Sequence, residues 1–310
     1  MRKVRWGVLG AARIATEKVI PAMQRSELGT VVAIASRELG SAQGVAARLG
    51  IATAYGSYEE LLADPAVDAI YNPLPNHLHR EWTIAAAERG KHVLCEKPIG
   101  MSSAEAAEVI AVRDRTGVKV QEAFMVRTHP QWLRAIDICR SGRLGPVTSY
   151  LGYFSYYNDD PADIRNIAAT GGGALMDIGC YLLMTARMIF AEEPRRVMAI
   201  IERDPDSTVD ILTSMMLDFP SGQAIGTCST RMAPYQRVHV SGSRGRLEIE
   251  IPFNAPNDRP CRLRIDGHGD LFGEEIETIE IDTCDQYRIQ ADTFSREILD
   301  DTDVAYPLEQ

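Results

Sequence analysis

The chain has 310 residues, of which 25% are charged and 45% hydrophobic, a composition typical of a globular protein and not of a disordered or fibrous one. Its length exceeds that of one ordinary domain, so we expect two domains. The formal net charge of −10 argues against long-range attraction to nucleic acid or to an anionic membrane, so neither is an expected partner.

Cysteine usage and the N-terminus indicate the compartment. The 6 cysteines are scattered without a Cys-x-x-Cys pair, which is typical of unpaired thiols under reducing conditions. The N-terminus runs into a strand-like pattern without the apolar stretch of a secretory signal, and no segment approaches about 18 continuous apolar residues. We therefore expect a cytoplasmic protein.

Residues 1–123 alternate short β-rich runs with helical stretches. Strands are expected at Val4–Leu9, Thr30–Ala35, Ala69–Tyr71, His92–Cys95 and Val118–Gln121. Alternation of this kind implies parallel strands joined by crossover helices, hence an α/β fold with a doubly wound Rossmann sheet. Capping boxes at Ser57-x-x-Glu60 and Ser102-x-x-Glu105 mark two of the helix starts.

The pattern changes after about Phe124, and residues 124–310 are predicted to form an α+β domain. Helices are expected near Gln131–Arg140, Ala174–Phe190 and Gln286–Leu299, and strands at Arg196–Glu202, Asp210–Asp218, Ala224–Thr230, Arg237–Ser241 and Arg246–Ile251. Turn residues separate the strands, as in a meander or an open, mainly antiparallel sheet.

The first strand ends in a glycine turn that leads directly into a helix. Such a turn aims backbone N–H groups and the positive helix terminus at a bound diphosphate. Against the pattern G-x-G-x-x-G/A the chain has Gly10, Ala12 and Ala15, so a methyl group stands where the middle glycine allows close backbone approach. On this motif alone, a simple tight turn is the alternative.

The second strand ends in Ser36-Arg37, where an NAD-binding chain presents an acidic side chain to the ribose. Serine and arginine supply hydrogen-bond donors for a 2′-phosphate instead, and a guanidinium can also stack on adenine. NADP is therefore favoured over NAD. The alternative makes Arg37 a solvated loop residue and Glu38 the ribose contact.

A loop framed by Pro73 and Pro75 follows the strand Ala69–Tyr71, at the sheet edge where ligands bind in open α/β sheets. His77 and His79 follow at i,i+2 spacing without a Cys or Asp cluster. Capping and packing are therefore favoured for these histidines, and no metal site is predicted.

The next strand ends in Cys95-Glu96-Lys97-Pro98. A lysine at this edge can exchange a proton with a substrate oxygen while a hydride passes to or from nicotinamide. Partial burial and the positive charge of oxidised nicotinamide would favour the neutral amine. The alternative is a surface ion pair between Glu96 and Lys97.

Taken in order, the glycine turn, the proline-framed loop and Glu96-Lys97-Pro98 resemble the glucose-fructose oxidoreductase / inositol dehydrogenase / rhizopine-catabolism (Gfo/Idh/MocA) family. The resemblance extends to Glu122–Pro130 and Gly171–Tyr181 and so covers nearly the whole chain. It implies a Rossmann domain followed by a domain built on a large open sheet, with the substrate bound between them. It also implies a homodimer or a larger homo-oligomer.

The resemblance further implies roles for single residues. In that family the lysine matching Lys97 transfers the proton, and the residues matching Asp177 and Tyr181 line the substrate pocket. Tyrosine at the latter position, where many members have histidine, is similar to the branch of NADP-dependent xylose dehydrogenases, dimeric dihydrodiol dehydrogenases and sugar ketoreductases. The departures are Ala12 for glycine and a chain end where relatives often continue into one more helix.

The second motif indicates a substrate site from its residues alone. Gly171–Gly173 permit a close backbone bend, and the next helix would place Asp177 and Tyr181 four residues apart on one face. A carboxylate beside a phenol can orient a sugar. The alternative has Asp177 compensating the helix dipole and Tyr181 in the core. Three further residues, either facing the pocket or acting as structural anchors, are Arg127, His129 and Arg165.

Hydride transfer to or from an aldose such as xylose, a ketosugar or a related diol is thus the expected activity, with Lys97, Tyr181 and Asp177 catalytic. The predicted cofactor-binding residues are Gly10, Ala12, Arg13, Ile14, Ser36, Arg37, Pro73, Leu74, Asn76, His79, Glu96 and Lys97. The predicted substrate-binding residues are Lys97, Arg127, Arg165, Asp177 and Tyr181. Two alternatives stay open: a glycosidase of the same family type that oxidises, eliminates and re-reduces with a retained cofactor, and a non-catalytic NADP(H) sensor.

Overall fold

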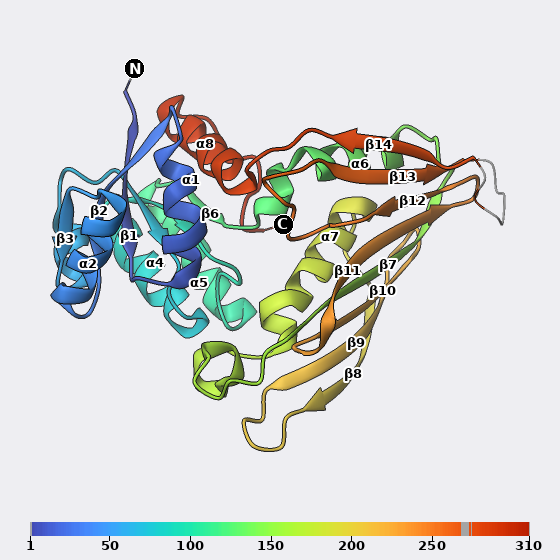
Figure 1. Cartoon of the computed structure of the whole chain (residues 1–310), viewed down its shortest axis with the longest axis horizontal. Coiled ribbons are helices and arrows are strands. Elements are labelled where there is room, and N and C mark those ends of the chain that lie inside the picture. The colour runs from blue at the N-terminus through green and yellow to red at the C-terminus, as the bar shows by residue number, and fades with distance from the viewer. Residues whose placement is uncertain (1, 268–272, 274, 310) are drawn as a thin grey trace. The chain divides into compact units, whose positions relative to one another are not determined.

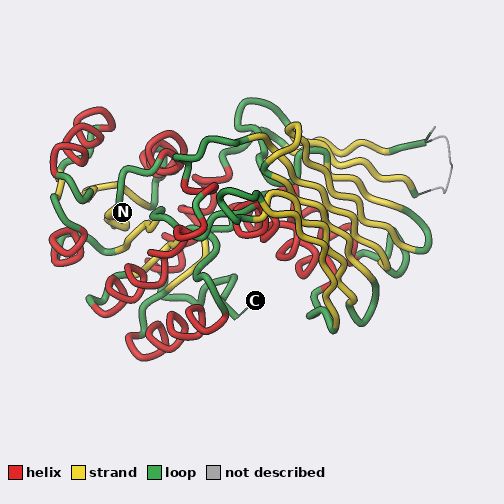
Figure 2. The backbone as a smooth tube through the Cα atoms, turned by 90° about the horizontal axis from the view of Figure 1, so that it is seen from below, coloured by secondary structure: helices red, strands yellow, loops and turns green. Residues whose placement is uncertain are grey.

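The computed structural model describes residues 2–267, 273 and 275–309 (Figure 1, Figure 2). It divides into two compact units. The first contains Met1–Met125 and Asp285–Gln310, and the second contains Val126–Cys284. The predicted division into 1–123 and 124–310 therefore differs from the observed one mainly in the last helix.

The first unit is built on a parallel sheet of six strands in the order β3-β2-β1-β4-β5-β6. The strands are β1 (Val4–Leu9), β2 (Gly29–Ala35), β3 (Thr53–Tyr55), β4 (Ala69–Asn72), β5 (His92–Cys95) and β6 (Val120–Glu122). Every neighbouring pair is parallel. The predicted doubly wound sheet is confirmed, and its strand order reverses between β1 and β4, where ligands bind in such folds.

Helices cover both faces of this sheet, as the two separate apolar clusters show. The helices are a π-helical turn (Ala15–Val19), α1 (Ile20–Gln24), α2 (Leu39–Leu49), α3 (Tyr58–Ala63), α4 (His79–Glu88), α5 (Ser103–Thr116) and α8 (Gln286–Leu299). Both predicted caps form: the Ser57 and Ser102 hydroxyls accept hydrogen bonds from the backbone N–H groups of Glu60 and Glu105. These bonds fix where α3 and α5 begin.

Helix α8 belongs to the first unit because its side chains pack there. The Phe294 ring lies 6.0 Å from the Trp6 ring, and the Trp6 indole N–H donates to the Ser295 hydroxyl at 3.3 Å. Arg25 forms an ion pair with Asp285, just before the helix. Residues 285–310, which the sequence analysis assigned to the second domain, therefore lie in the first unit, because the short segment 282–285 after β14 returns the chain to it.

The second unit is built on a mixed sheet of eight strands in the order β14-β13-β12-β11-β7-β10-β9-β8. The strands are β7 (Val147–Tyr157), β8 (Arg196–Arg203), β9 (Asp210–Asp218), β10 (Gln223–Ser229), β11 (Arg231–Gly242), β12 (Arg246–Ile249), β13 (Cys261–Asp266) and β14 (Glu277–Ile281). All neighbours are antiparallel except β7 and β10. The large, mainly antiparallel sheet is thus confirmed, although β7, β13 and β14 were not predicted.

Helices α6 (Pro130–Arg140) and α7 (Cys180–Phe190) pack on one face of this sheet (Figure 1). Aromatic rings join them, since Phe253 stacks on both Trp132 and Phe154, and Phe154 meets Tyr181 edge to face. The helical stretch Ala168–Phe190 is long and apolar enough to span a membrane by length and composition, contrary to the sequence analysis. Because 61% of its apolar window is buried, we interpret it as a core helix.

Apolar side chains are exposed on two parts of the second sheet. Leu151, Ile225 and Met216 lie beside one another on β7, β10 and β9 and are each more than 40% exposed. On the edge strand β8, every residue is exposed, including Met198 and Ile200. Exposed apolar patches often mark interaction sites, and the homo-oligomer stays a prediction.

Candidate functional site

The glycine turn after β1 has the geometry that a phosphate cradle needs. Gly10 has φ +80°, a left-handed conformation that glycine adopts without strain, and its N–H donates to the Ala35 carbonyl at 2.7 Å. A Cβ at Gly10 would lie 2.9 Å from the Leu74 side chain. The turn and the proline-framed loop therefore approach closely at the sheet's reversal point.

Three predicted cofactor residues follow Gly10, namely Ala12, Arg13 and Ile14, and their side chains lie in different surroundings. The carbonyl of half-buried Ala12 accepts the N–H of Thr16 at 3.0 Å, so Ala12 lies at the entry to the helical segment that continues into the π-helical turn. Ile14 packs against the core. Arg13 is exposed and pairs with Glu17, so its cation points to solvent.

Arg37 lies at the end of β2 as an exposed side chain. Among the described residues no ion pair involves it, and its positive charge acts on Tyr58, where burial raises the pKa and Arg37 opposes that rise. The neighbouring Ser36 donates its N–H to the Tyr55 carbonyl at 3.2 Å. A solvated guanidinium at this strand end fits a 2′-phosphate, whereas Glu38 begins α2 as its N-cap residue.

His79 holds together two segments that were predicted to meet the cofactor. It is 1% exposed, and its ring nitrogens lie 2.6 Å from the Leu74 carbonyl oxygen and 2.7 Å from the Pro98 carbonyl oxygen. Burial lowers the pKa of His79, and the nearby Lys97 charge lowers it further. The His79 ring therefore connects the proline-framed loop to the turn after β5 from inside the protein. Pro73 and Leu74 are buried, and Asn76 begins a short 3-10 turn (Asn76–Leu78).

Lys97 follows β5 in a turn that neighbouring strands hold in place. The buried Tyr71 hydroxyl donates to Glu96 Oε1 at 2.7 Å, and the Glu96 N–H donates to the Asn72 carbonyl at 2.9 Å. On the other side, the Ile99 N–H donates to Glu122 Oε1 at 2.7 Å. Lys97 is half-buried, and its peptide bond to Pro98 is cis. The β4, β5 and β6 ends thus fix the backbone that carries the lysine.

The second unit brings three side chains together around Asp177. Tyr156 at the end of β7 donates its hydroxyl to Asp177 Oδ2 at 2.6 Å, and Arg165 Nε lies 3.2 Å from the same oxygen. Burial raises the pKa of Tyr156, and the Asp177 charge raises it further. The Asp177 charge also raises the pKa of Arg165, so the Arg165 guanidinium stays ionised beside it. Tyr156 was missed because the strand β7 was missed.

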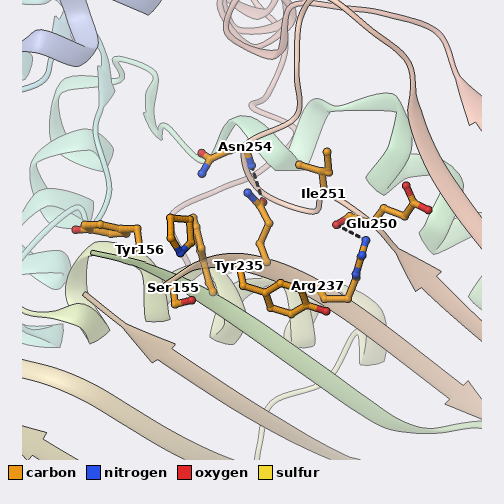
Figure 3. A pocket seen from close by; sticks show the side chains of 10 residues that line it. Ser155, Tyr156, Tyr235, Arg237, Glu250, Ile251 and Asn254 are labelled. Carbon is orange, nitrogen blue, oxygen red and sulfur yellow. Dashed lines mark hydrogen bonds between the residues drawn. The ribbon is translucent and has the colours of Figure 1, made fainter. Parts of the chain in front are cut away.

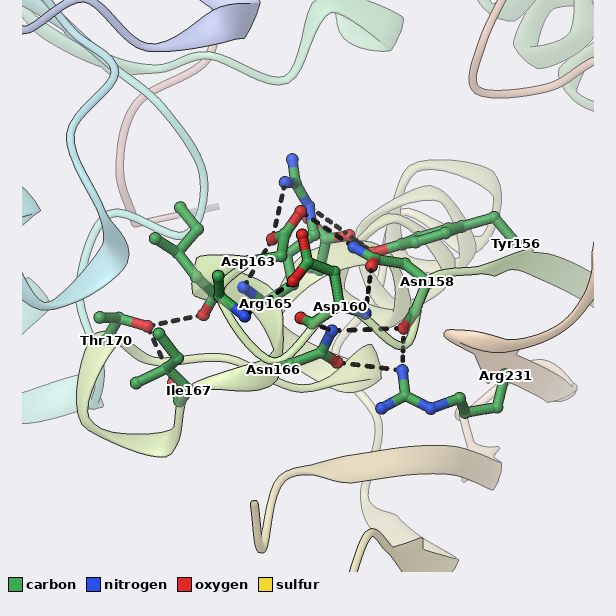
Figure 4. Close-up of polar contacts among 12 residues, drawn as sticks. Tyr156, Asn158, Asp160, Asp163, Arg165, Asn166, Ile167, Thr170 and Arg231 are labelled. Atoms are coloured by element: carbon green, nitrogen blue, oxygen red, sulfur yellow. Dashed lines mark hydrogen bonds and ion pairs between the residues drawn. The ribbon is translucent and has the colours of Figure 1, made fainter. Parts of the chain in front are cut away.

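The segment before Asp177 is compact and internally bonded (Figure 4). Asn166 donates to the carbonyls of Asn158 and Asp160, and Arg231 binds the Asn158 carbonyl and Asn166 Oδ1. Arg165 also faces Asp163 at 3.3 Å. These contacts set the position from which Arg165 reaches Asp177.

The triple glycine permits the bend that sequence analysis predicted. Gly171 and Gly173 have φ of +80° and +118°. A Cβ at Gly172 would lie 2.5 Å from the Arg165 carbonyl oxygen, and one at Gly173 only 2.0 Å from Asp210 Oδ1. Asp210 in turn accepts the N–H of Leu175 at 2.7 Å. Side chains are thus excluded where the loop meets the helix.

The helix after this bend differs from the regular one that was predicted. Leu175–Gly179 form a π-helical turn before α7 begins at Cys180, so the four-residue spacing of Asp177 and Tyr181 does not place them as in a regular α-helix. Single π turns are frequent at functional sites. Tyr181 is 6% exposed among the rings of Phe154 and Phe253, which is close to the core alternative.

Arg127 and His129 are both buried in the second unit. His129 Nδ1 accepts the Gln131 N–H at 3.1 Å at the start of α6, and its Nε2 lies 3.3 Å from Cys284 Sγ. His129 is therefore a structural anchor. Arg127 lies in a 3-10 turn (Met125–Thr128), and its contact with substrate stays a prediction. So does the meeting of Lys97 with Asp177 and Tyr181, which belong to different units.

A cavity of about 490 Å³ lies beside Tyr156 in the second unit (Figure 3). Its walls come from the end of β7, the first half of β11 and the segment after β12: Phe154, Ser155, Tyr156, Pro234, Tyr235, Gln236, Arg237, Glu250, Ile251 and Asn254. The volume falls within the range of roughly 300–1,000 Å³ usual for small-molecule sites. No sequence motif indicated this cavity.

Comparisons with known proteins identify both parts of the chain. Residues 4–124 match the model of the GFO_IDH_MocA oxidoreductase family with an NAD-binding Rossmann fold, and residues 132–248 match the GFO/IDH/MocA C-terminal domain. An uncharacterized oxidoreductase of Rhizobium meliloti is 48% identical, over 96% of this chain and 90% of its own. The D-xylose 1-dehydrogenase (NADP(+)) 2 of Haloferax volcanii is 42% identical, over 94% and 88%.

A solved structure shows the same fold over its whole length. A 3-ketoreductase from Actinomadura kijaniata, in complex with NADP and TDP-benzene, superposes with a TM-score of 0.91 at 30% identity, covering 99% of this chain and 93% of its own. Both this enzyme and the Haloferax relative are named with NADP. The cofactor prediction from Ser36-Arg37 agrees with these relatives.

Proposed function

Because the chain belongs to the Gfo/Idh/MocA oxidoreductase family, we propose that it transfers a hydride between NADP(H) and the anomeric carbon of an aldose such as xylose. The observation that carries this proposal is the braced, half-buried Lys97 at the carboxyl end of β5. The identity with the Haloferax D-xylose dehydrogenase favours an aldose. Ketosugar reduction, the reverse type of reaction, is supported by the Actinomadura 3-ketoreductase.

The residues present fit a phosphorylated dinucleotide. Gly10, with its positive φ and the Leu74 side chain close by, keeps the turn after β1 tight at the start of the helix, and the exposed Arg37 offers a cation for a 2′-phosphate. The cofactor set of the sequence analysis is therefore proposed for this group, with His79 acting from inside the loop that it holds. When bound, oxidised nicotinamide supplies the hydride acceptor.

The protein's own residues handle the proton and the sugar. Lys97 takes the proton of the anomeric hydroxyl as the C–H bond breaks, which leaves a lactone; in a reduction it returns the proton to the carbonyl oxygen. Asp177, held by Arg165 and Tyr156, accepts a hydrogen bond from a sugar hydroxyl. Tyr181 and Arg127 complete the proposed substrate set.

Variants of a relative support the choice of Lys97 and Tyr181. The Actinomadura enzyme has been solved with one lysine replaced by alanine or by glutamate, and with one tyrosine replaced by phenylalanine. Those two positions are separated in its chain by the same number of residues as Lys97 and Tyr181 here. The equal spacing argues that they correspond.

The test is the variant Lys97→Met, assayed for NADPH formation with aldoses and for NADPH consumption with ketosugars. We expect turnover to fall by about 10²-fold or more with NADP+ affinity retained, whereas exposed Lys3→Met leaves turnover unchanged. Retained turnover in Lys97→Met would refute the role of the lysine. Cleavage of a glycoside without added NADP would favour the glycosidase, and inactivity of the wild type toward every aldose, ketose and dihydrodiol would favour a sensor.

A further inference from the structure

The cavity beside Tyr156 shares a wall with the predicted substrate residues. The Tyr156 ring lines it, while the Tyr156 hydroxyl binds Asp177. Figure 3 shows Tyr156 at one end of the lining residues and Arg237 toward the other. A ligand held at Asp177 would therefore have the cavity next to it, on the far side of one phenol ring.

The charged groups in the cavity wall are compensated within the protein. Arg237 donates from Nη1 to the Glu250 carbonyl at 2.7 Å, and its Nε lies 3.4 Å from Glu248. The Glu250 carboxylate pairs with Arg264 at 2.7 Å and with Arg262 at 3.2 Å. With its charged groups paired in this way, the wall suits a neutral ligand better than a diphosphate.

The remaining wall is aromatic and amide-bearing, and it is held in place. The Tyr235 ring packs edge to face on Tyr153 at 5.5 Å and receives the Arg237 guanidinium at 5.7 Å. Gln236 Oε1 accepts the N–H groups of Phe253 and Asn254 at 2.9 and 3.0 Å, so the segment after β12 is fixed to β11. Aromatic faces with a few placed polar groups bind small ligands that have both apolar and hydroxyl surfaces.

We propose that this cavity is a subsite for a second, neutral sugar unit joined to the reacting sugar, so that the preferred substrate is a disaccharide with a free anomeric carbon. The proposal rests on the proposed function and extends it. The reducing unit lies at Asp177 and undergoes the oxidation, and the other unit occupies the cavity lined by Tyr235, Gln236 and Asn254.

The test measures binding separately from turnover. Calorimetric titration of the whole protein with xylobiose and with xylose, in the presence of NADPH so that no oxidation occurs, gives the two affinities. We expect xylobiose to bind about tenfold more tightly. Asn254→Trp, which fills the cavity from an exposed position, should reduce xylobiose affinity to that of xylose and leave xylose binding unchanged.

Asn257→Trp is the matched control, since Asn257 is also exposed and does not line the cavity. Tyr235→Ala should weaken xylobiose binding without adding bulk. Equal affinities for the two sugars, or an Asn254→Trp variant that weakens both equally, would overturn the subsite, as would tighter binding of a nucleotide-linked sugar. If the xylobiose preference holds but no sugar is oxidised, the proposed activity fails and the subsite stands. If xylose is oxidised but xylobiose is not preferred, the subsite fails and the proposed activity stands.

Discussion

Acid should destabilise the second unit through His129. This side chain is 1% exposed, and burial lowers its pKa to about 4. Its Nδ1 accepts the Gln131 N–H at the start of α6, so the neutral ring must carry its proton on Nε2, which faces Cys284 Sγ. Protonation of Nδ1 would abolish that acceptor and leave a charge in the core.

The size of the effect follows from the two pKa values. An unfolded histidine has a pKa near 6.5, so on acidification the unfolded chain takes up the proton first and folding loses stability between about pH 6.5 and pH 4. The loss attributable to His129 is about 2 kcal/mol between pH 7 and pH 5, and about 3 kcal/mol by pH 4. Above pH 7 the contribution is complete and constant.

His129→Asn isolates the contribution of His129 to the pH dependence of stability, because the asparagine side-chain oxygen can cap α6 in the same way but does not titrate. Urea unfolding followed by circular dichroism at pH 7.5, 5 and 4 gives the free energy of unfolding of each protein. The variant should lose about 2 kcal/mol less than the wild type between pH 7.5 and pH 5. The exposed His77→Asn control should retain the wild-type pH dependence. Parallel curves for His129→Asn and the wild type would refute the reasoning.

Three further substitutions test the site and the bend beside it. Arg37→Ala should raise KM for NADP+ by about tenfold to a hundredfold while leaving KM for NAD+ unchanged, and the exposed Arg48→Ala should change neither in steady-state kinetics. Tyr156→Phe removes the hydroxyl that holds Asp177, so kcat/KM for the sugar should fall about tenfold or more; Tyr157→Phe, whose hydroxyl binds Asp159 at the surface, should not lower it. Gly173→Ala should lower the free energy of unfolding by about 3 kcal/mol or more, measured by thermal unfolding, because the alanine would have a positive φ and its Cβ would clash with Asp210. The control Gly44→Ala lies in α2 with open space around it and should raise the free energy of unfolding by about 0.5–1 kcal/mol.

The apolar spacing within a segment predicted those helices and strands whose buried face shows a regular pattern in their own residues. β1 and α8 begin and end where their apolar spacing indicated, at Val4–Leu9 and Gln286–Leu299. β7 was missed although it lies in the centre of the second sheet. On its core-facing side the buried aromatic residues Tyr150 and Phe154 are separated by Gly152, which packs against Leu182. The apolar alternation is therefore broken at Gly152, where the Leu182 side chain of α7 lies against the strand.

In the candidate site, too, a local pattern indicated single residues but not their partners from other strands. Gly10, Arg37 and Lys97 could be proposed from the sequence because each follows a recognisable strand, and strand ends in a parallel sheet gather at one edge. The partners of these residues could not be identified, because a hydrogen bond such as Tyr71 to Glu96 depends on which strand ends become neighbours. The π turn at Leu175–Gly179 was equally hidden, since a wider turn leaves no distinct residue pattern.

The strand order nevertheless explains why the missed partners are where they are. β5 lies between β4 and β6, so the turn that carries Lys97 has Tyr71 on one side and Glu122 on the other. Both contacts act on backbone or side chain next to the lysine and not on its ammonium group. The backbone position of Lys97 is therefore set by two neighbouring strands together, and the residues that set it, Tyr71 and Glu122, lie outside the Glu96-Lys97-Pro98 motif.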